Sequence, residues 1–363
     1  MFEKRRDRLR ATLKRNGHKA MLVTNEINVT YLTGFTGDSS YLLVTRDAAT
    51  ILTDSRYNTQ LEEECPGLPM ISRTSATSMM EILSRRLKPE KLAAIAVEGD
   101  SLSKNLFDSL ASGLGDVELV PTTGIVETLR QIKDKHELGE IRRSVHMAQR
   151  TFEVIRSSLR AEMSEREVAA NLEHQIRAFG GVGCAFKPIV GVGPRAALPH
   201  AVPGQRRIEE SPFVLIDWGA KAGQYLSDLT RVLVTGKISP KLRQIYEVVL
   251  RAQLAAIDKI KPGVKSSEVD RAARKVIEDA GFGKKFGHGL GHGFGLEIHE
   301  SPKMSSSNQM ELKPGMVVTV EPGIYLPNWG GVRIEDDILV TNDGHEVLSN
   351  LTKNLDECVV DLG

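Results

Sequence analysis

The chain has 363 residues, which is long for one average domain and comfortable for two. Lysine and arginine number 48 against 47 aspartate and glutamate, so the formal net charge of +1 gives no field that would attract nucleic acid or an anionic membrane. Cys65, Cys184 and Cys358 are far apart and form no CxxC pair, which argues against a disulfide framework and a zinc knuckle.

The N-terminal segment MFEKRRDRLRATLKR is charged where a signal peptide would be apolar, and no later run approaches the ~18 apolar residues of a membrane span. We therefore expect a soluble, cytoplasmic protein that acts on a small neutral or mixed-charge partner. Neither nucleic acid nor a membrane is expected as a partner.

The first third of the chain alternates helix-like and strand-like patterns. An amphipathic stretch from Phe2 to Arg15 predicts a helix. Four short apolar runs that follow are typical of buried strands, namely AMLVT, YLLVT, TILTD and AAIAVEG. This alternation predicts a small α/β domain.

A charged, helix-compatible stretch begins near Val126 and continues with few breakers to residue 161. We place the domain boundary near its start, which gives a first domain over residues 1–127 and a second over 128–363.

Two further helices and several strands are expected in the second domain. Ser164 and Glu167 have capping-box spacing, and Ser239 precedes Pro240 and an apolar periodic stretch, so each serine predicts the start of a helix. Strand-like runs occur between and after them, namely FVLIDWGA, LTRVLVTG, MVVTVEPG and VRIEDDILV. The second domain is therefore predicted to be α+β.

Two of these apolar runs end in an acid, at Asp217 and at Glu321. Ionised carboxylates in a core need a partner or a metal. The segment from Asp217 to Asp228 has its midpoint at residues 222–223, and a tight hairpin turning there would place the two aspartates directly opposite each other. That is a costly position for bare carboxylates and a good one for metal ligands. Two solvated acids beside a surface hairpin are the alternative.

The run GHGLGHGFGLEIHE contains His288, His292 and His299 among alternate glycines. These glycines make a helix improbable, so the histidines are not arranged as in an HExxH zinc protease. In an extended chain His288 and His292 share one face, and the glycines let the backbone approach a ligand or a neighbouring strand. Taken singly, each histidine is more often structural than a metal ligand.

In VRIEDDILV, Arg333 and Glu335 are two residues apart and should project from the same face of a strand. A surface strand with an ion pair would look similar. Together, however, four acids and one histidine supply the ligand set of a carboxylate-bridged two-metal centre. The four acids are Asp217, Asp228, Glu321 and Glu335.

Four motifs occur in the order and at the spacing of one known family: SDLTR, GHGLGHGFGLEIHE, VEPGIY and GGVRIED. On these motifs the C-terminal half resembles the pita-bread metallopeptidases. With YLTGF and ILTDSRY in the first third, nearly the whole chain resembles the branch of aminopeptidase P and prolidase. The resemblance implies a creatinase-like α/β N-terminal domain followed by an α+β pita-bread catalytic domain.

The resemblance also implies how the metals are held. Asp217 and Asp228 would bind the first ion, Asp228 with Glu321 and Glu335 would link the pair, and His292 would complete the second site. Two divalent ions per chain are implied. The oxygen-rich ligand set suits Mn²⁺, Co²⁺ or Fe²⁺ better than an ion that prefers thiolates, and we expect Mn²⁺ or Co²⁺.

Further residues are implied to act around the metals. His200, in ALPHAVPG, and His299 would line the substrate site and assist proton movement or stabilise the tetrahedral intermediate. Glu321 would also act as the general base, and Arg333 would hold the centre. His288 is a further candidate on the substrate side.

The implied function is a metal-dependent Xaa-Pro aminopeptidase that releases the residue before proline by attack of a metal-bridging hydroxide. The compact length and ILTDSRY favour it over the alternative, a prolidase restricted to Xaa-Pro dipeptides. A metal-free creatinase-like amidinohydrolase and a non-catalytic binding protein are further alternatives, and the intact ligand set argues against both. Proline-containing peptides are the implied partners, and family habit implies a homodimer.

Overall fold

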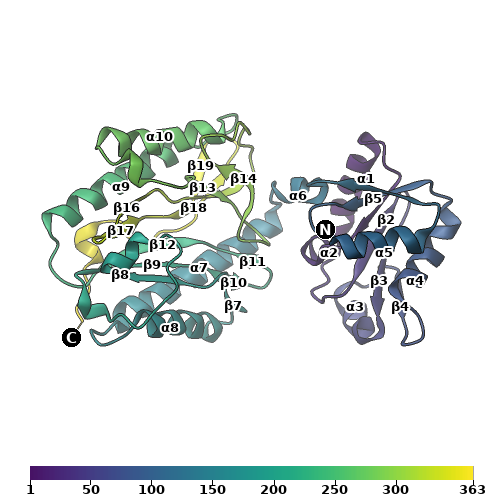
Figure 1. Cartoon of the computed structure of the whole chain (residues 1–363), viewed down its shortest axis with the longest axis horizontal. Helices are drawn as coiled ribbons and strands as arrows, with labels where there is room; N and C mark the ends of the chain where they lie inside the picture. Colours follow the sequence, from purple (N-terminus) through teal and green to yellow (C-terminus); the bar gives the residue numbers. More distant parts are fainter. Residues whose placement is uncertain (363) are drawn as a thin grey trace. The chain divides into compact units, whose positions relative to one another are not determined.

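The structure, a computed structural model, describes residues 1–362 and divides into two compact units. The first unit is Met1–Arg130, and the second begins at Gln131. In Figure 1 the first unit is coloured from purple to blue, and the colours of the second unit continue through teal and green to yellow.

One mixed sheet forms the centre of the N-terminal unit. Its strands are β1 (Ala20–Val23), β2 (Tyr41–Thr45), β3 (Ala49–Asp54), β4 (Met70–Arg73), β5 (Ala94–Glu98) and β6 (Glu118–Thr122). Their order is β4-β3-β2-β1-β5-β6, with β2 antiparallel to β1 and β3 and the remaining pairs parallel. The four strand-like runs of the sequence lie in β1, β2, β3 and β5, so this prediction is confirmed.

The helices of the N-terminal unit bury apolar faces against that sheet. They are α1 (Phe2–Arg15), α2 (Glu26–Thr33), α3 (Asn58–Glu64), α4 (Met79–Leu87), α5 (Lys104–Leu114) and α6 (Ile125–Arg130). Leu83 of α4 and Leu110 of α5 pack in one buried cluster with Leu22 and Val97 of the sheet. The helix predicted from Phe2 to Arg15 is confirmed as α1.

Three of the four α-helices described in the C-terminal unit begin at residues whose side chains cap them, namely α7 (Lys135–Ser158), α8 (Glu165–Ala178) and α9 (Pro240–Lys259). The fourth is α10 (Ser266–Asp279). Ser164 Oγ accepts a hydrogen bond from Glu167 N at 3.2 Å, and Ser239 Oγ accepts one from Leu242 N at 3.1 Å, which confirms both predicted helix starts. The helix-compatible stretch after Val126 contains two helices rather than one.

The reason for that break is a cap that was not recognised in the sequence. Asp134 Oδ1 accepts hydrogen bonds from His136 N at 2.9 Å and Glu137 N at 3.0 Å. A side chain that satisfies these otherwise unpaired N–H groups starts a new helix, so α7 begins after Asp134 and is separate from α6.

The strands of the C-terminal unit form several sheets. They are β7 (Gly183–Cys184), β8 (Ile189–Val192), β9 (Phe213–Trp218), β10 (Ala220–Ala222), β11 (Tyr225–Leu226), β12 (Leu229–Val234), β13 (Gly291–Gly293), β14 (Glu300–Met304), β15 (Val317–Val320), β16 (Gly323–Leu326), β17 (Gly330–Arg333), β18 (Asp336–Val340) and β19 (His345–Val347). Among the described residues the sheet orders are β12-β9-β8, β11-β10-β7, β14-β13-β15-β18-β19 and β16-β17. In Figure 1 these strands lie between the pair α7 and α8 and the pair α9 and α10.

Buried apolar side chains join these layers. Val249 of α9 and Ile277 of α10 belong to one cluster with Val318 of β15. Phe152 of α7 stacks on Trp218 of β9 with ring centroids 4.5 Å apart. Because removal of apolar surface from water is the main favourable term in folding, these clusters hold the strand ends in place.

The segment VRIEDDILV is not one strand, as was predicted, but two strands in two sheets. Arg333, the last residue of β17, pairs with Gly323 of β16, whereas Asp336, the first residue of β18, pairs with Val320 of β15. Glu335 lies between them at the point where the chain leaves one sheet and enters the next. The prediction failed because an unbroken apolar pattern does not show with which strand each residue pairs.

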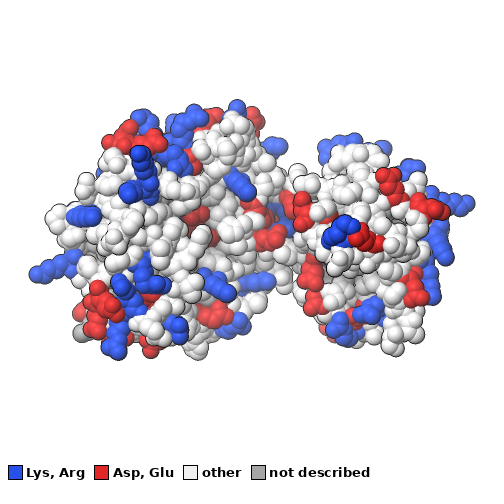
Figure 2. All heavy atoms as spheres, in the orientation of Figure 1, with Lys and Arg blue, Asp and Glu red and all other residues white. Residues whose placement is uncertain are grey.

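The distribution of charged residues on the two units agrees with the net charge of +1. On the face of each unit drawn in Figure 2, lysine and arginine are interspersed with aspartate and glutamate. Within residues 1–362 no helix is both long enough and apolar enough to cross a membrane.

Candidate metal centre

Three buried carboxylates from separate strand ends meet inside the C-terminal unit. Asp217 is near the end of β9, Asp228 immediately precedes β12, and Glu335 lies between β17 and β18. One carboxylate oxygen of each lies within 4.8 Å of the others. Each side chain is almost completely buried.

The hairpin that carries the two aspartates has a different register from the predicted one. Asp217 pairs with Thr230 rather than with Asp228, because the hairpin turns at Gly223 and Gln224. Gly223 has a φ of 60°, in the left-handed region that favours glycine. Direct opposition was therefore wrong, but a displacement of two residues keeps Asp228 on the same face of the ladder as Asp217.

His292 and Glu321 extend the cluster. His292 Nε2 lies 3.6 Å from Asp228 Oδ2 and 3.4 Å from Glu321 Oε1. The extended conformation predicted for the glycine-rich run is found around His292, in β13, which pairs with β15 through Gly293 and Val318. Because Glu321 immediately follows β15, that pairing brings it to the histidine. The structure thus brings together all five residues that the sequence predicts as ligands.

Burial of several acids in one place strongly changes their titration. Burial raises the pKa of Asp228 well above its ordinary value, and the neighbouring carboxylates of Glu335 and Asp217 raise it further. Burial likewise raises the pKa of Glu335 well above its ordinary value and that of Glu321 to about 8. These carboxylates can all be ionised near neutral pH only if positive charge is bound among them.

Unpaired oxygens in the cluster fit such a cation. Asp217 Oδ1 and Glu335 Oε1 are buried and have no hydrogen-bond partner among the described residues, which is costly unless another group binds them. His292 Nδ1 lies 3.1 Å from the Gly293 carbonyl oxygen and can donate to it, which leaves Nε2 as a lone pair directed at the acids. Carboxylate oxygens with one imidazole nitrogen are suitable donors for divalent transition metals.

Arg333 supports the cluster from one side. Its Nη2 donates to Asp217 Oδ2 at 2.5 Å, and its Nε donates to Thr230 Oγ1 at 3.1 Å. Its Nη1 donates to the Tyr325 hydroxyl at 2.8 Å, and that hydroxyl lies 2.8 Å from His288 Nε2. His288 is therefore placed beside Tyr325, and its contact with substrate remains a prediction.

His200 and His299 lie at the exposed side of the cluster. The ring centroids of His299 and His292 are 4.4 Å apart. Burial of part of the ring lowers the pKa of His299, the nearby His200 lowers it further, and Asp217 opposes both effects. Both histidines are thus close enough to the acids to interact with them electrostatically, and both remain accessible to a ligand.

Some residues of the centre were not recognised in the sequence. Thr230 Oγ1 donates to Glu335 Oε2 at 2.6 Å, and Thr319 Oγ1 donates to Glu321 Oε1 at 3.2 Å. Asp337 Oδ2 accepts a hydrogen bond from the backbone N of Asp228 at 3.1 Å. Each threonine is two residues from a predicted ligand in or beside a strand, and this spacing was a usable signal because such residues share a face.

Comparison with known proteins gives the family. Residues 5–132 match the Creatinase/Prolidase N-terminal domain, and residues 139–342 match Metallopeptidase family M24. The chain is 35% identical over 355 residues to the Xaa-Pro dipeptidase of Pyrococcus furiosus, with 98% of this chain and 100% of that protein covered.

Solved structures agree. The Xaa-Pro dipeptidase from Bacillus anthracis superposes with a TM-score of 0.94 at 38% identity, covering 98% of this chain and 99% of that chain. The X-Pro aminopeptidase from Thermotoga maritima superposes with a TM-score of 0.89 at 33% identity, covering 96% and 99%. The predicted fold, a creatinase-type N-terminal domain followed by a pita-bread domain, is confirmed. This chain belongs to Metallopeptidase family M24 and is a metallopeptidase.

Proposed function

We propose that the chain is a metal-dependent Xaa-Pro dipeptidase, which hydrolyses the peptide bond before proline in dipeptides. The observation that carries this proposal is the buried group of Asp217, Asp228 and Glu335 beside His292 and Glu321. The sequence alone favoured an aminopeptidase. Two full-length relatives are Xaa-Pro dipeptidases, and they support the alternative instead.

We infer that two divalent ions, Mn²⁺ or Co²⁺, are held by these five residues. Asp217, Asp228 and His292 would each supply a ligand atom, and Glu321 and Glu335 would hold the ions together with Asp228. Such ions would supply Lewis acidity, which lowers the pKa of a bound water towards about 7 and polarises the scissile carbonyl.

The protein's own residues hold and move the proton. We infer that Glu321 accepts the proton of the attacking water and passes it to the departing proline nitrogen. The hydrogen bond from Thr319 Oγ1 to Glu321 Oε1, 3.2 Å long, orients this carboxylate. The ion pair of Arg333 with Asp217 similarly orients the Asp217 carboxylate.

His200 and His299 are assigned to the substrate carbonyl. Negative charge develops on that oxygen during attack, and an imidazole N–H directed at it stabilises the transition state, typically by a few kcal/mol per donor, about 2.7–4 in measured examples. Both rings are exposed at the edge of the acid cluster, where a substrate can reach them.

An Xaa-Pro aminopeptidase acting on longer peptides is the second candidate. The observation that favours it is the likeness to the X-Pro aminopeptidase from Thermotoga maritima. The five retained residues and the family favour either peptidase over a metal-free amidinohydrolase or a binding protein.

Hydrolysis of Ala-Pro, Ala-Pro-Ala and Ala-Ala-Ala by Mn²⁺- and Co²⁺-loaded protein tests the proposal. A bond before proline lacks the N–H that general exopeptidases bind, so its hydrolysis needs a dedicated site. We therefore expect the highest kcat/KM for Ala-Pro and no cleavage of Ala-Ala-Ala. A higher kcat/KM for Ala-Pro-Ala would establish the aminopeptidase. Comparable cleavage of Ala-Ala-Ala would reject both Xaa-Pro activities.

A further inference from the structure

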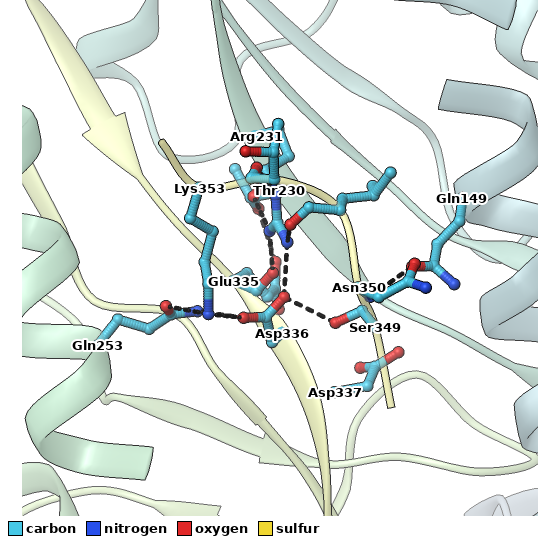
Figure 3. Close-up of polar contacts among 12 residues, drawn as sticks. Gln149, Thr230, Arg231, Gln253, Glu335, Asp336, Asp337, Ser349, Asn350 and Lys353 are labelled. Carbon is cyan, nitrogen blue, oxygen red and sulfur yellow. Dashed lines mark hydrogen bonds and ion pairs between the residues drawn. The ribbon is translucent and has the colours of Figure 1, made fainter. Parts of the chain in front are cut away.

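A buried ionic network lies directly beside the metal centre without containing any of its predicted ligands. Its central carboxylate, Asp336, is the first residue of β18 and is fully buried. Asp336 Oδ1 accepts hydrogen bonds from Arg231 Nη2 and Ser349 Oγ, both at 2.7 Å. Its Oδ2 accepts from Lys353 Nζ at 2.6 Å and Gln253 Nε2 at 3.0 Å, as Figure 3 shows. One carboxylate therefore joins β12, β18, α9 and the segment after β19.

The guanidinium of Arg231 is also completely used. Its five N–H groups find five acceptors, which matches the full donor capacity of arginine. The acceptors are the carbonyl oxygens of Thr230 (3.0 Å), Glu335 (2.6 Å), Leu351 (3.0 Å) and Thr352 (3.2 Å) and Asp336 Oδ1 (2.7 Å). Arg231 thus connects the backbone on both sides of the metal centre to the C-terminal segment.

Stability alone does not account for this arrangement. Removing two or more charges from water is costly, and well-packed apolar residues of similar volume often replace a buried ion pair without loss of stability. A charged network provides directional contacts, which an apolar cluster does not. Here those contacts converge on the backbone at Thr230 and Glu335.

Glu335 is the ligand that most needs such support. It lies in the connection between β17 and β18, which belong to different sheets, so the regular ladder of either sheet does not hold it. Its backbone N donates to Thr230 O at 3.2 Å, and its Oε2 accepts from Thr230 Oγ1 at 2.6 Å. Arg231 Nη1 binds the carbonyl oxygens of both residues, so it fixes the ligand and its hydrogen-bond donor together.

We propose that Arg231 and Asp336 are positioning residues for the metal ligand Glu335, an inference that rests on the proposed metal centre. Arg231 holds the crossing of β12 and the β17–β18 connection, and Asp336 holds the guanidinium in that position. Lys353 and Ser349 anchor the carboxylate from the C-terminal segment. Metal-binding sites require placement of their ligands to within about 0.5 Å, and partners outside the ligand set supply it.

Titration calorimetry with Mn²⁺ on the full chain tests the assignment, with urea unfolding of the metal-free protein as a parallel measurement. Asp336→Asn keeps the size of the side chain but removes its charge and puts an N–H₂ group against one of the two cations, Arg231 or Lys353. Arg231→Lys keeps the charge but loses the planar five-donor fork. For both variants we expect Mn²⁺ affinity to fall by about 10- to 100-fold, the usual effect of losing a partner of a metal ligand.

Asp356→Asn is the matched control. Asp356 Oδ1 accepts from Arg243 Nη2 at 2.6 Å in the same unit, but this pair is exposed. We expect Mn²⁺ affinity within about twofold of wild type, because exposed ion pairs hold their partners weakly. Lys353→Met is a milder variant because Lys353 is partly exposed. It reports on the same carboxylate if Asp336→Asn does not fold, and we expect a Mn²⁺ affinity below that of wild type.

The outcomes separate the two proposals. Wild type that binds no Mn²⁺ refutes the metal centre itself. Wild type that binds Mn²⁺ while folded Asp336→Asn, Arg231→Lys or Lys353→Met binds it equally tightly, even with lowered stability, refutes the positioning role and makes the network purely structural. Weaker Mn²⁺ binding in the folded variants, with the control unchanged, supports it.

Discussion

At the scale of single residues, Asp228 links the three-carboxylate group to His292 in the proposed metal centre. Its carboxylate belongs to the group with Asp217 and Glu335 and lies 3.6 Å from His292. Its backbone N–H is held by Asp337 Oδ2. Since Asp228 is near both the other carboxylates and His292, single substitutions of the surrounding residues can show which of them bind metal and which act on the substrate.

His299→Ala is expected to lower kcat on the order of 100-fold while the metal content stays at the wild-type value. The ring lies beside His292 but outside the group of acids, as suits a group that hydrogen-bonds the substrate. Steady-state kinetics and elemental analysis check this, with His174→Ala on the exposed face of α8 as the control. Loss of metal would make His299 a ligand, and full activity would make it structural.

Glu321 predicts a pH dependence of the metal-free protein. Its pKa is raised to about 8, mainly by burial, above an ordinary value of about 4.3. The folded state then holds the proton more tightly, so this contribution to stability is complete below about pH 4.3 and is lost as pH rises to about 8.

The comparison with Glu321→Gln isolates that contribution. After treatment with a chelator, the unfolding free energy of wild type should fall relative to the variant by up to about 1.4 kcal/mol per pH unit between about pH 6 and pH 8. Urea unfolding at both pH values measures it. Parallel pH profiles of the two proteins would contradict the raised pKa.

At the scale of secondary structure, the centre is assembled at places where strands end or change sheets. Asp217 is near the end of β9, Glu321 follows β15, and Glu335 connects β17 to β18. A strand end can direct a polar side chain inward because the neighbouring residues of the strand still pair with the adjacent strand. The helices that cover the sheets keep these ends in register through packing, so a defect at a helix start should affect stability before it affects the centre.

Ser164→Ala tests that separation. Ser164 Oγ accepts from Glu167 N, and Glu167 Oε2 accepts from Ser164 N, at the start of α8. Removal of such a cap costs about 1 kcal/mol. Thermal unfolding should show this loss while Mn²⁺ binding is unchanged. Ser157→Ala, an exposed position on α7, should change stability by less than about 0.5 kcal/mol. Equal effects of the two substitutions would contradict the role of the cap.

At the scale of the whole molecule, all five predicted ligands and the network around Asp336 lie in the unit that begins at Gln131. Both tryptophans, Trp218 and Trp329, lie in the same unit. Tryptophan fluorescence therefore reports the unfolding of the unit that contains the proposed metal centre, whereas far-UV circular dichroism reports both units.

Mn²⁺ should consequently raise the unfolding midpoint seen by fluorescence. A ligand at 100 times its Kd stabilises the state that binds it by about 2.7 kcal/mol per site. Thermal scans with and without Mn²⁺ measure the shift, and NaCl at the same ionic strength is the control. An unchanged fluorescence midpoint would contradict metal binding in this unit.

Much of the centre could be predicted because its signals are local. Acids that end apolar strands, glycines that exclude a helix around His292 and capping serines before α8 and α9 are each visible in a few neighbouring residues. Their chemistry follows from residue type, since buried carboxylates and an imidazole need a cation. The sequence by itself therefore determined the fold class and the five candidate ligands.

Long-range pairing decided the rest. Displacing a hairpin by two residues leaves the apolar pattern unchanged, so only the structure shows that Asp217 faces Thr230. The contact of Arg231 with Asp336 joins residues about a hundred positions apart in the chain. The change of sheet at Glu335 depends on which strands Arg333 and Asp336 pair with. Such contacts depend on which strands become neighbours, and that is set by packing of the whole unit rather than by any short segment.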